Sequence, residues 1–136
     1  MLKYLLDTSV YSQRLKLNPC RGTIEKWSSL GNSVLAISAC CEAELLFGLE
    51  KKGSTRLWHE YDHYLKDQLT LLPFGYREAV EYASLRKTLT AKGTPVADMD
   101  LQIAATAIGN GLILATLNSR HFQHIPGLKI EDWSRD

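Results

Sequence analysis

The sequence contains few cysteines, almost no net charge and no long apolar run. Its 136 residues include three cysteines and carry a formal net charge of +1. Cys20, Cys40 and Cys41 form no C-x-x-C pair, which argues against a disulfide framework and fits buried thiols in a reducing compartment. No segment approaches the roughly 20 apolar residues that span a bilayer, and the apolar run at the start is too short for a signal peptide. These absences predict a cytoplasmic protein without a membrane segment.

The sequence also lacks internal repeats, low-complexity tracts and linker-like stretches. With 45% hydrophobic and 23% charged residues, it has the composition of an ordinary globular domain, and its length is sufficient for one substantial core. We therefore expect residues 1–136 to form a single domain. Because the net charge is close to zero, charge gives no overall argument for or against a nucleic-acid partner.

Short apolar runs alternate with helical patterns along the chain. The runs predict strands at residues 3–7, 33–38, 69–73, 112–116 and 128–133. Between them, capping residues and glycines predict helices over about 8–17, 19–30, 39–51, 54–68, 76–91 and 98–110, with Thr8 or Ser9 as the first cap. Nearly all-apolar strands separated by helices are typical of a parallel sheet covered on both faces. Functional sites in such folds lie beyond the carboxyl ends of the strands, which is where Asp7, Thr116 and Asn118 occur.

Two aspartates open the last of these helices, in the segment PVADMDLQIAATA. On a helix of 3.6 residues per turn, Asp98 and Asp100 point about 200° apart. Asp98 begins a mixed face and is predicted to cap the helix. Asp100 shares its face with Ile103, Ala104 and Ala107, where a carboxylate is costly unless it is paired or bound to a cation. The alternative for Asp100 is an acid of the first helical turn that the helix dipole stabilises.

Acids from three separate segments could meet at one edge of the sheet. Asp7 ends a buried strand, where it either serves as a turn or cap residue or presents a carboxylate at the sheet edge. Glu42 and Glu44 lie on different faces of the helix over 39–51, and periodicity does not choose between them. Clustered carboxylates raise each other's pKa values. Mg²⁺ or Mn²⁺ would relieve that repulsion, because both ions prefer oxygen ligands.

A second motif, H-E-x-x-H, occurs as HEYDH at His59 to His63. Two histidines four residues apart on a helix can bind zinc with Glu60 as general base, as in a zinc metallopeptidase. The sequence offers no evident third ligand beyond Glu78 or Glu81. The simpler interpretation is two surface histidines.

Segments spread over residues 2–133 resemble, in order, the conserved blocks of PIN-domain proteins. They are LLDTSV, ISACCEAELLFGLEK and GTPVADMDLQIAATAIGNGLILATLNSRHFQHIPGLKIEDW. The resemblance is in particular to the VapC-type ribonuclease toxins of type II toxin–antitoxin systems. It implies a three-layer α/β/α sandwich with a mostly parallel central sheet and an endoribonuclease that depends on Mg²⁺ or Mn²⁺. It also implies an RNA substrate, a cognate antitoxin and a homodimer.

The resemblance assigns roles to individual residues. Asp7, Glu44 and Asp100 match the family's catalytic acids. It follows that Asp7 and Asp100 would hold the metal ion, while Glu44 would be a further ligand or orient the attacking water. The polar neighbours that would support these acids are Ser9, Thr116 and Asn118. The residues that bind the RNA are not identified by the sequence.

One position departs from the family pattern. Where many relatives carry a further acid after the fourth strand, this chain has Thr116, Asn118 and His121. Asn118 can offer a carbonyl oxygen but brings no charge, which favours one resident metal ion over two. The departure also leaves open a non-catalytic PIN-like module that only binds RNA or a partner. For the antitoxin, the helices between Pro19 and Gln68 could offer a groove for an amphipathic peptide. The alternative for their aromatic residues is a place in the core; these are Trp27, Phe47, Trp58, Tyr61 and Tyr64.

Overall fold

Five short apolar segments pair as a parallel sheet in the computed structural model, which describes residues 1–134. The order of the strands is β3-β2-β1-β4-β5, and each neighbouring pair is parallel. The first strand lies at the centre and the sheet extends from it on both sides, so the strand order reverses at β1. In such sheets the crevice at the point of reversal, at the carboxyl ends of the strands, is where ligands bind. The strands are β1 (Tyr4–Leu6), β2 (Leu35–Ser38), β3 (Thr70–Leu72), β4 (Ile113–Thr116) and β5 (Ile130–Asp132).

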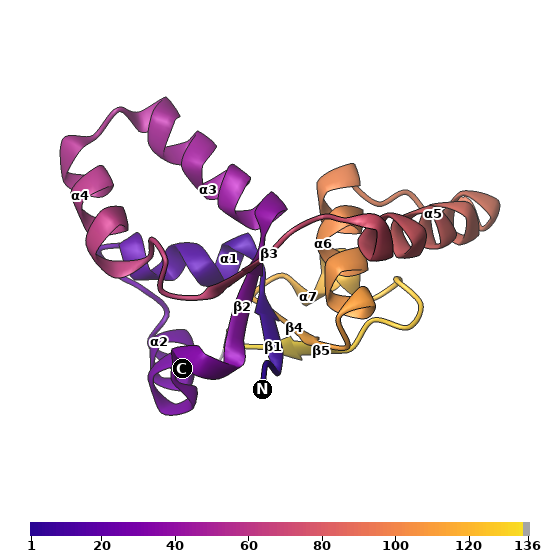
Figure 1. Ribbon diagram of the computed structural model, residues 1–136, viewed down its shortest axis with the longest axis horizontal. Coiled ribbons are helices and arrows are strands. Elements are labelled where there is room, and N and C mark those ends of the chain that lie inside the picture. The colour runs from indigo at the N-terminus through magenta and orange to yellow at the C-terminus, as the bar shows by residue number, and fades with distance from the viewer. Residues whose placement is uncertain (135–136) are drawn as a thin grey trace.

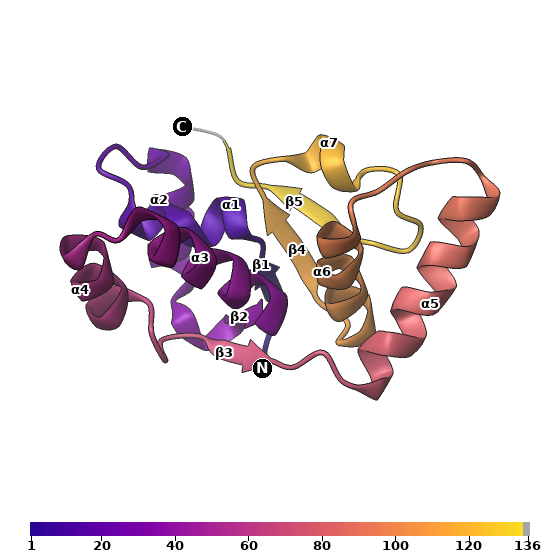
Figure 2. The ribbon, with the colours of Figure 1, turned by 90° about the horizontal axis from the view of Figure 1, so that it is seen from above.

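Helices cover both faces of the sheet (Figure 1, Figure 2). One group consists of α1 (Thr8–Tyr11), α2 (Arg21–Leu30), α3 (Ala39–Lys52) and α4 (Thr55–Tyr64). The other consists of α5 (Tyr76–Ala91) and α6 (Asp98–Gly109), with the short α7 (Ser119–Phe122) after β4. This arrangement confirms the predicted three-layer sandwich, with a sheet that is parallel throughout residues 1–134. Within the same residues, no helix is long and apolar enough to cross a membrane.

Alternate residues of the central strand enter two separate cores. Tyr4 and Leu6 pack in a core with Trp27 of α2, whereas Leu5 packs in a second core with Ile103 of α6. Every residue of β1 and of β2 is buried. The nearly continuous apolar runs of these strands therefore reflect burial on both faces, as parallel sheets require.

The first helix differs from its prediction in length, and its cap is Asp7, one of the two roles considered for that residue, and not Thr8 or Ser9. Asp7 is the N-cap, and its side chain accepts a hydrogen bond from the amide of Val10. Thr8 and Ser9, the predicted caps, lie one and two positions too late because the strand ends directly before Asp7. After Tyr11 the chain tightens into a 3₁₀ turn at Ser12–Leu15, so the predicted helix over 8–17 is divided.

Other elements also differ from the predictions: α2 begins at Arg21 and not at Pro19, and β5 is shorter at both ends. A 3₁₀ turn at Asn32–Val34 takes the first residues of the predicted second strand. The helix predicted to reach residue 68 ends at Tyr64, ahead of Asp67, whose φ of 61° is incompatible with a continuing helix. The short helix α7 was not predicted at all. It is only four residues long, which is too short to show a helical period.

Asp98 does not cap α6, so that prediction is wrong. Ala97 is the N-cap and makes no side-chain bond, while Asp98 is already helical. The carboxylate of Asp98 instead accepts hydrogen bonds from the Tyr82 hydroxyl and from Gln102 Nε2 (3.1 Å), and it pairs with Arg86 Nη1 at 3.6 Å. Tyr82 and Arg86 belong to α5, so donors from the neighbouring helix draw this carboxylate away from the first-turn amides.

Glu78 is a buried acid that joins α5 to the end of α6, and its removal is expected to destabilise the fold. It is 6% exposed, and it accepts hydrogen bonds from Gly75 N and Asn110 Nδ2, each at 2.9 Å. Burial alone would raise the pKa of Glu78, but these hydrogen bonds outweigh it and lower the pKa. Glu78→Ala leaves both donors without this partner, so we expect a loss of about 2–3 kcal/mol in the free energy of unfolding.

Urea denaturation at pH 7 measures this loss, with the exposed Lys87→Ala on the same helix as the control. Because the pKa of Glu78 is lowered in the fold, its stabilisation is present at neutral pH and declines as the pH falls toward and below the ordinary carboxyl pKa of about 4.3. Equal stability of the two variants at pH 7 would contradict the role given to Glu78.

Candidate acidic active site

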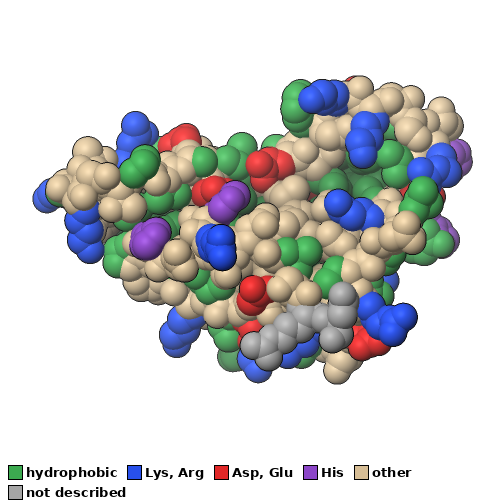
Figure 3. Space-filling view, turned by 180° about the vertical axis from the view of Figure 1, so that it is seen from behind, with side chains coloured by type: hydrophobic (Ala, Val, Ile, Leu, Met, Phe, Trp, Pro, Cys, Tyr) green, Lys and Arg blue, Asp and Glu red, His purple; other side chains and the backbone are tan. Residues whose placement is uncertain are grey.

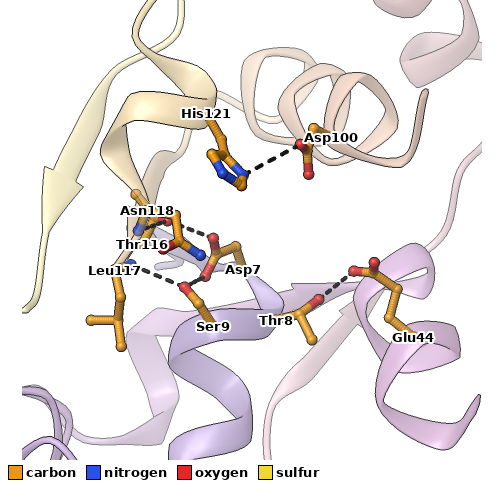
Figure 4. Close-up of polar contacts among 9 residues, drawn as sticks. All are labelled: Asp7, Thr8, Ser9, Glu44, Asp100, Thr116, Leu117, Asn118 and His121. Atoms are coloured by element: carbon orange, nitrogen blue, oxygen red, sulfur yellow. Dashed lines mark hydrogen bonds and ion pairs between the residues drawn. The ribbon is translucent and has the colours of Figure 1, made fainter. Parts of the chain in front are cut away.

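Side chains from four parts of the chain line one cavity of about 260 Å³ at the carboxyl edge of the sheet. Asp7 comes from the end of β1, Glu44 from α3, Asp100 from α6 and His121 from α7. Figure 4 shows these side chains around a common space. Thr8, Ser9, Ile103, Asn118 and Phe122 complete the lining. The structure thus brings together the three acids that the sequence analysis singled out.

Asp7 is held rigidly at the base of the cavity. It is 4% exposed. Its Oδ1 accepts hydrogen bonds from Ser9 Oγ (2.6 Å) and Val10 N (3.1 Å), and its Oδ2 accepts one from Thr116 Oγ1 (2.5 Å). Burial raises the pKa of Asp7, and the hydrogen bonds from Ser9, Thr116 and Val10 oppose that rise. The carboxylate therefore combines a fixed orientation with an environment that disfavours its uncompensated charge.

The hydroxyls that orient Asp7 are themselves fixed by the chain after β4. Ser9 Oγ accepts a hydrogen bond from Leu117 N at 3.0 Å, and Thr116 Oγ1 accepts one from Asn118 N at 2.9 Å. Ser9 and Thr116 thus lie around Asp7 as the sequence analysis expected. Asn118 lines the cavity, and its backbone contributes to the same network (Figure 4).

Glu44 and Glu42 differ in their hydrogen-bond partners and in whether they line the cavity. Glu44 lines the cavity, and its Oε1 accepts a hydrogen bond from Thr8 Oγ1. Glu42 does not line the cavity and accepts a hydrogen bond from the hydroxyl of Tyr11 at 3.1 Å. The geometry therefore distinguishes two acids that helical periodicity left equivalent, and it favours Glu44 as the site residue.

Asp100 faces the cavity, whereas Asp98 faces α5. The side chain of Asp100 is 24% exposed, against 60% for Asp98. Burial raises the pKa of Asp100; the nearby carboxylates Glu44 and Asp7 raise it further, and His121 opposes them. Nδ1 of His121 lies 3.8 Å from Asp100 Oδ2. The predicted separation of the two aspartates on opposite faces of α6 is therefore present, although Asp98 serves as a link to α5 and not as a cap.

His121 is the cavity residue to which the sequence analysis gave no role. It occurs in the block after β4 where many relatives carry an acid. The sequence signal that points to His121 is its position, three residues after Asn118 and next to the apolar Phe122. In the structure the side chain of Phe122 is only 2% exposed. The buried Phe122 turns α7 against the second core and holds His121 at the cavity mouth, where its side chain is 62% exposed.

The donor set fits a hard divalent cation. Three carboxylates share the cavity, and two of them raise the pKa of the third, so a cation would remove a repulsion that already exists. Within residues 1–134, no three His, Cys, Asp or Glu side chains are already grouped closely enough to enclose an ion. Mg²⁺ does not require such a cage, because it usually keeps several waters and is held by one or two carboxylates together with substrate phosphates.

The H-E-x-x-H segment does not form a zinc site in the described part of the chain. His59 and His63 are exposed on α4, and Glu60 is paired with Arg56 at 2.7 Å. No third ligand joins them among residues 1–134. The structure therefore agrees with the simpler interpretation of two surface histidines.

Basic side chains are spread around the acidic region. The space-filling view shows Asp, Glu and His side chains gathered near the middle of one face, with Lys and Arg side chains distributed around them (Figure 3). A phosphate-bearing chain crossing this face would meet cations on its way to the acids.

Comparison with known proteins gives a consistent set of matches. The family model described as PIN domain matches residues 4–128. A protein of Salmonella typhimurium named tRNA(fMet)-specific endonuclease VapC is 34% identical over 133 residues, which covers 98% of this chain and 99% of that protein. A protein of Haemophilus influenzae named Ribonuclease VapC2 is 29% identical over 98% of this chain and 99% of its own length.

Solved structures extend the likeness to three dimensions. The crystal structure of DNA-bound VapBC from Salmonella typhimurium contains a chain with a TM-score of 0.87 and 34% identity, covering 98% of this chain and 99% of that one. The structure of VapBC2 from Rickettsia felis bound to a promoter DNA fragment gives a TM-score of 0.87 at 30% identity, covering 97% and 99% of the two chains. The similarity therefore spans the whole fold, including every element that contributes to the acidic cavity.

Proposed function

This chain belongs to the PIN-domain family, and we propose that it is a metal-dependent endoribonuclease, the toxin of a toxin–antitoxin pair. The observation that carries the proposal is the cavity at the carboxyl edge of the sheet, where Asp7, Glu44 and Asp100 from three separate elements face one space. Two relatives named as VapC nucleases, 34% and 29% identical over nearly the full chain, support the reaction class.

We propose Mg²⁺ or Mn²⁺ as the cofactor, held by Asp7 and Asp100. A divalent cation at this position would polarise the scissile phosphate and lower the pKa of a bound water toward neutrality. Asp7 is kept in place by Ser9, Val10 and Thr116, so it supplies a fixed oxygen. Asn118 supplies polar lining without charge.

Glu44 is proposed to be a further ligand or to orient the attacking water. The hydrogen bond from Thr8 fixes one of its carboxylate oxygens, which leaves the other oxygen to accept a proton or a hydrogen bond from water. Attack by water in line with the leaving group would give a 3′-hydroxyl and a 5′-phosphate.

The product ends test this function directly. The purified chain is incubated with RNA, including tRNA(fMet), because a relative carries that substrate in its name. We expect cleavage with Mn²⁺ or Mg²⁺, none after EDTA, recovery on adding the ion back, and fragments that bear 5′-phosphates. Fragments that end in 2′,3′-cyclic phosphate and still form in the presence of EDTA would rule out the proposed chemistry. Tight RNA binding without cleavage under all conditions would favour the non-catalytic binding module instead.

Glu44→Gln is expected to slow cleavage about ten- to hundredfold, the range seen when a group that positions a metal or its water is removed. Glutamine keeps the size and the hydrogen bond from Thr8 but lacks the negative charge. The matched control is Glu42→Gln on the same helix, whose carboxylate faces Tyr11 and not the cavity. Single-turnover rates on one RNA at saturating Mn²⁺ make the comparison, and equal rates for the two variants would remove Glu44 from the site.

A groove next to the acidic cavity suits the proposed antitoxin. It has a volume of about 260 Å³, lies between the 3₁₀ turn at Ser12–Leu15, α3 and α4, and is lined by several leucines. Thr8 and Glu44 line both the groove and the cavity, so a peptide lying in the groove would reach the acids. We propose that an amphipathic segment of the antitoxin binds there.

A homodimer and a cytoplasmic location also belong to this proposal; the buried thiols of Cys40 and Cys41 suit a reducing compartment.

A further inference from the structure

His121 gives the acidic cavity a nitrogen donor. Among the described residues that line the cavity it is the one imidazole, beside three carboxylates, two hydroxyls and one amide. Its ring is oriented by α7 toward α6, with Nδ1 facing Asp100 Oδ2 (Figure 4). The sequence places no acid at the equivalent point of this block, so the chemistry of the donor set here depends on what the imidazole does.

The spacing of His121 and Asp100 suits two ligands of one ion. Nitrogen and oxygen donors lie about 2.0–2.2 Å from Mg²⁺ or a first-row transition-metal ion. Two such donors on one ion are therefore about 3 Å apart at a right angle and about 4 Å apart when nearly opposite. The observed separation of 3.8 Å between Nδ1 and Oδ2 falls within that range. It is longer than a strong charge-assisted hydrogen bond, which is about 2.7–2.9 Å.

The nature of the donors decides which ion they select. Mg²⁺ is a hard cation that takes oxygen ligands and gives up water reluctantly. Imidazole suits transition-metal ions better than it suits Mg²⁺. Mn²⁺ usually takes oxygen ligands, but it is a softer ion than Mg²⁺ and more readily accepts an imidazole nitrogen beside carboxylates. We propose that His121 is a direct ligand of the resident ion together with Asp100, and that it gives the site a preference for Mn²⁺ over Mg²⁺. The inference rests on the proposed metal-dependent function and adds to it the identity of a ligand and of the preferred ion.

Pulsed electron paramagnetic resonance of the Mn²⁺-loaded protein tests the ligand without measuring cleavage. A histidine nitrogen bound to Mn²⁺ produces ¹⁴N modulation of the electron spin echo. We expect this modulation in the wild type, its loss in His121→Glu, and its persistence in His124→Gln, which changes an exposed histidine three residues further along. Competition between Mg²⁺ and Mn²⁺, followed by the free Mn²⁺ signal, is expected to show a Mn²⁺ preference that falls at least about tenfold in His121→Glu.

A second variant avoids any change at the site. The chain has four histidines, so replacing His59, His63 and His124 together by glutamine leaves His121 as the single imidazole. Retention of the ¹⁴N modulation in this triple variant assigns the signal to His121 even if His121→Glu fails to fold.

Two results would overturn the inference. If Mn²⁺ binding requires Asp100 but the bound ion shows no ¹⁴N modulation, then His121 is not a ligand. That result would leave the proposed nuclease function intact. An unchanged ratio of Mn²⁺ to Mg²⁺ affinity in a folded His121→Glu would exclude the proposed preference. Failure of the wild type to bind either ion, by contrast, would count against the metal-dependent function and the inference together.

Discussion

Asparagine in place of Asp100 is expected to reduce the rate of RNA cleavage by about 10³-fold or more. The reason is that metal assistance is worth several kcal/mol of transition-state stabilisation, and each 1.4 kcal/mol or so is a factor of ten in rate. Asp100 projects from α6 into the cavity that Asp7 and Glu44 also line. Asparagine keeps the shape of the side chain but removes the charge that attracts the ion. Single-turnover cleavage at several Mn²⁺ concentrations measures the loss, together with the shift in apparent metal affinity.

The matched control for this variant lies two residues away on the same helix. Asp98→Asn removes a carboxylate that binds Tyr82 and Arg86 of α5 and does not line the acidic cavity. Its ion pair is exposed, so the expected cost is about 0–1 kcal/mol of stability and less than about a threefold change in rate. Cleavage that survives Asp100→Asn, or that is lost equally in Asp98→Asn, would be incompatible with the proposed site.

Asp7→Asn is expected to abolish cleavage to a similar extent, about 10³-fold or more, without weakening the fold. The amide oxygen can still accept the hydrogen bond from Val10 N, and the amide nitrogen can donate to Thr116. Because burial raises the pKa of Asp7, the folded state disfavours its ionised form. At pH 7 the charge therefore costs stability, and a neutral side chain removes that cost. Thermal unfolding in the absence of metal should show a midpoint equal to or above that of the wild type.

Asp7→Ala provides the comparison that separates chemistry from structure. It removes the charge and also the cap of α1 and the partner of Ser9 and Thr116. Loss of such a cap costs about 1 kcal/mol, and the loss of the acceptor for the hydroxyls of Ser9 and Thr116 adds about 1–3 kcal/mol, so Asp7→Ala should unfold at a lower temperature than Asp7→Asn. If Asp7→Asn is strongly destabilised, or if it still cleaves RNA, the assignment of Asp7 as a metal ligand is wrong.

The layers of the fold could be predicted from the sequence because burial on both faces leaves a clear signal. Leu5 and Leu6 point to opposite cores and are both 0% exposed, so the first strand must be apolar throughout. The same reasoning located the end of that strand and hence Asp7. The face of Asp100 could also be predicted, because Ile103, Ala104 and Ala107 behind it are 0–2% exposed.

Other features depended on contacts that no local pattern contains. Asp98 has the residue type of a cap, but Ala97 occupies the cap position, and the carboxylate of Asp98 accepts a hydrogen bond from Tyr82, sixteen residues earlier. Glu42 and Glu44 became distinguishable only through Tyr11 and Thr8, which approach α3 from another segment. These are long-range hydrogen bonds, and helical periodicity carries no information about them.

The bond between Asp7 and Thr116 joins residues 109 positions apart in the sequence, and β1 pairs directly with β4. The cavity therefore cannot form on a growing polypeptide until almost the whole chain has left the ribosome. At about 5–20 residues per second of synthesis, the interval between the emergence of Asp7 and that of Asn118 is several seconds at least. During that interval the nascent chain carries Asp7 but lacks Thr116 and Asn118, so a chain interrupted before β4 cannot complete the cavity. The order of the strands thus also delays completion of the acidic cavity until late in the synthesis of the chain.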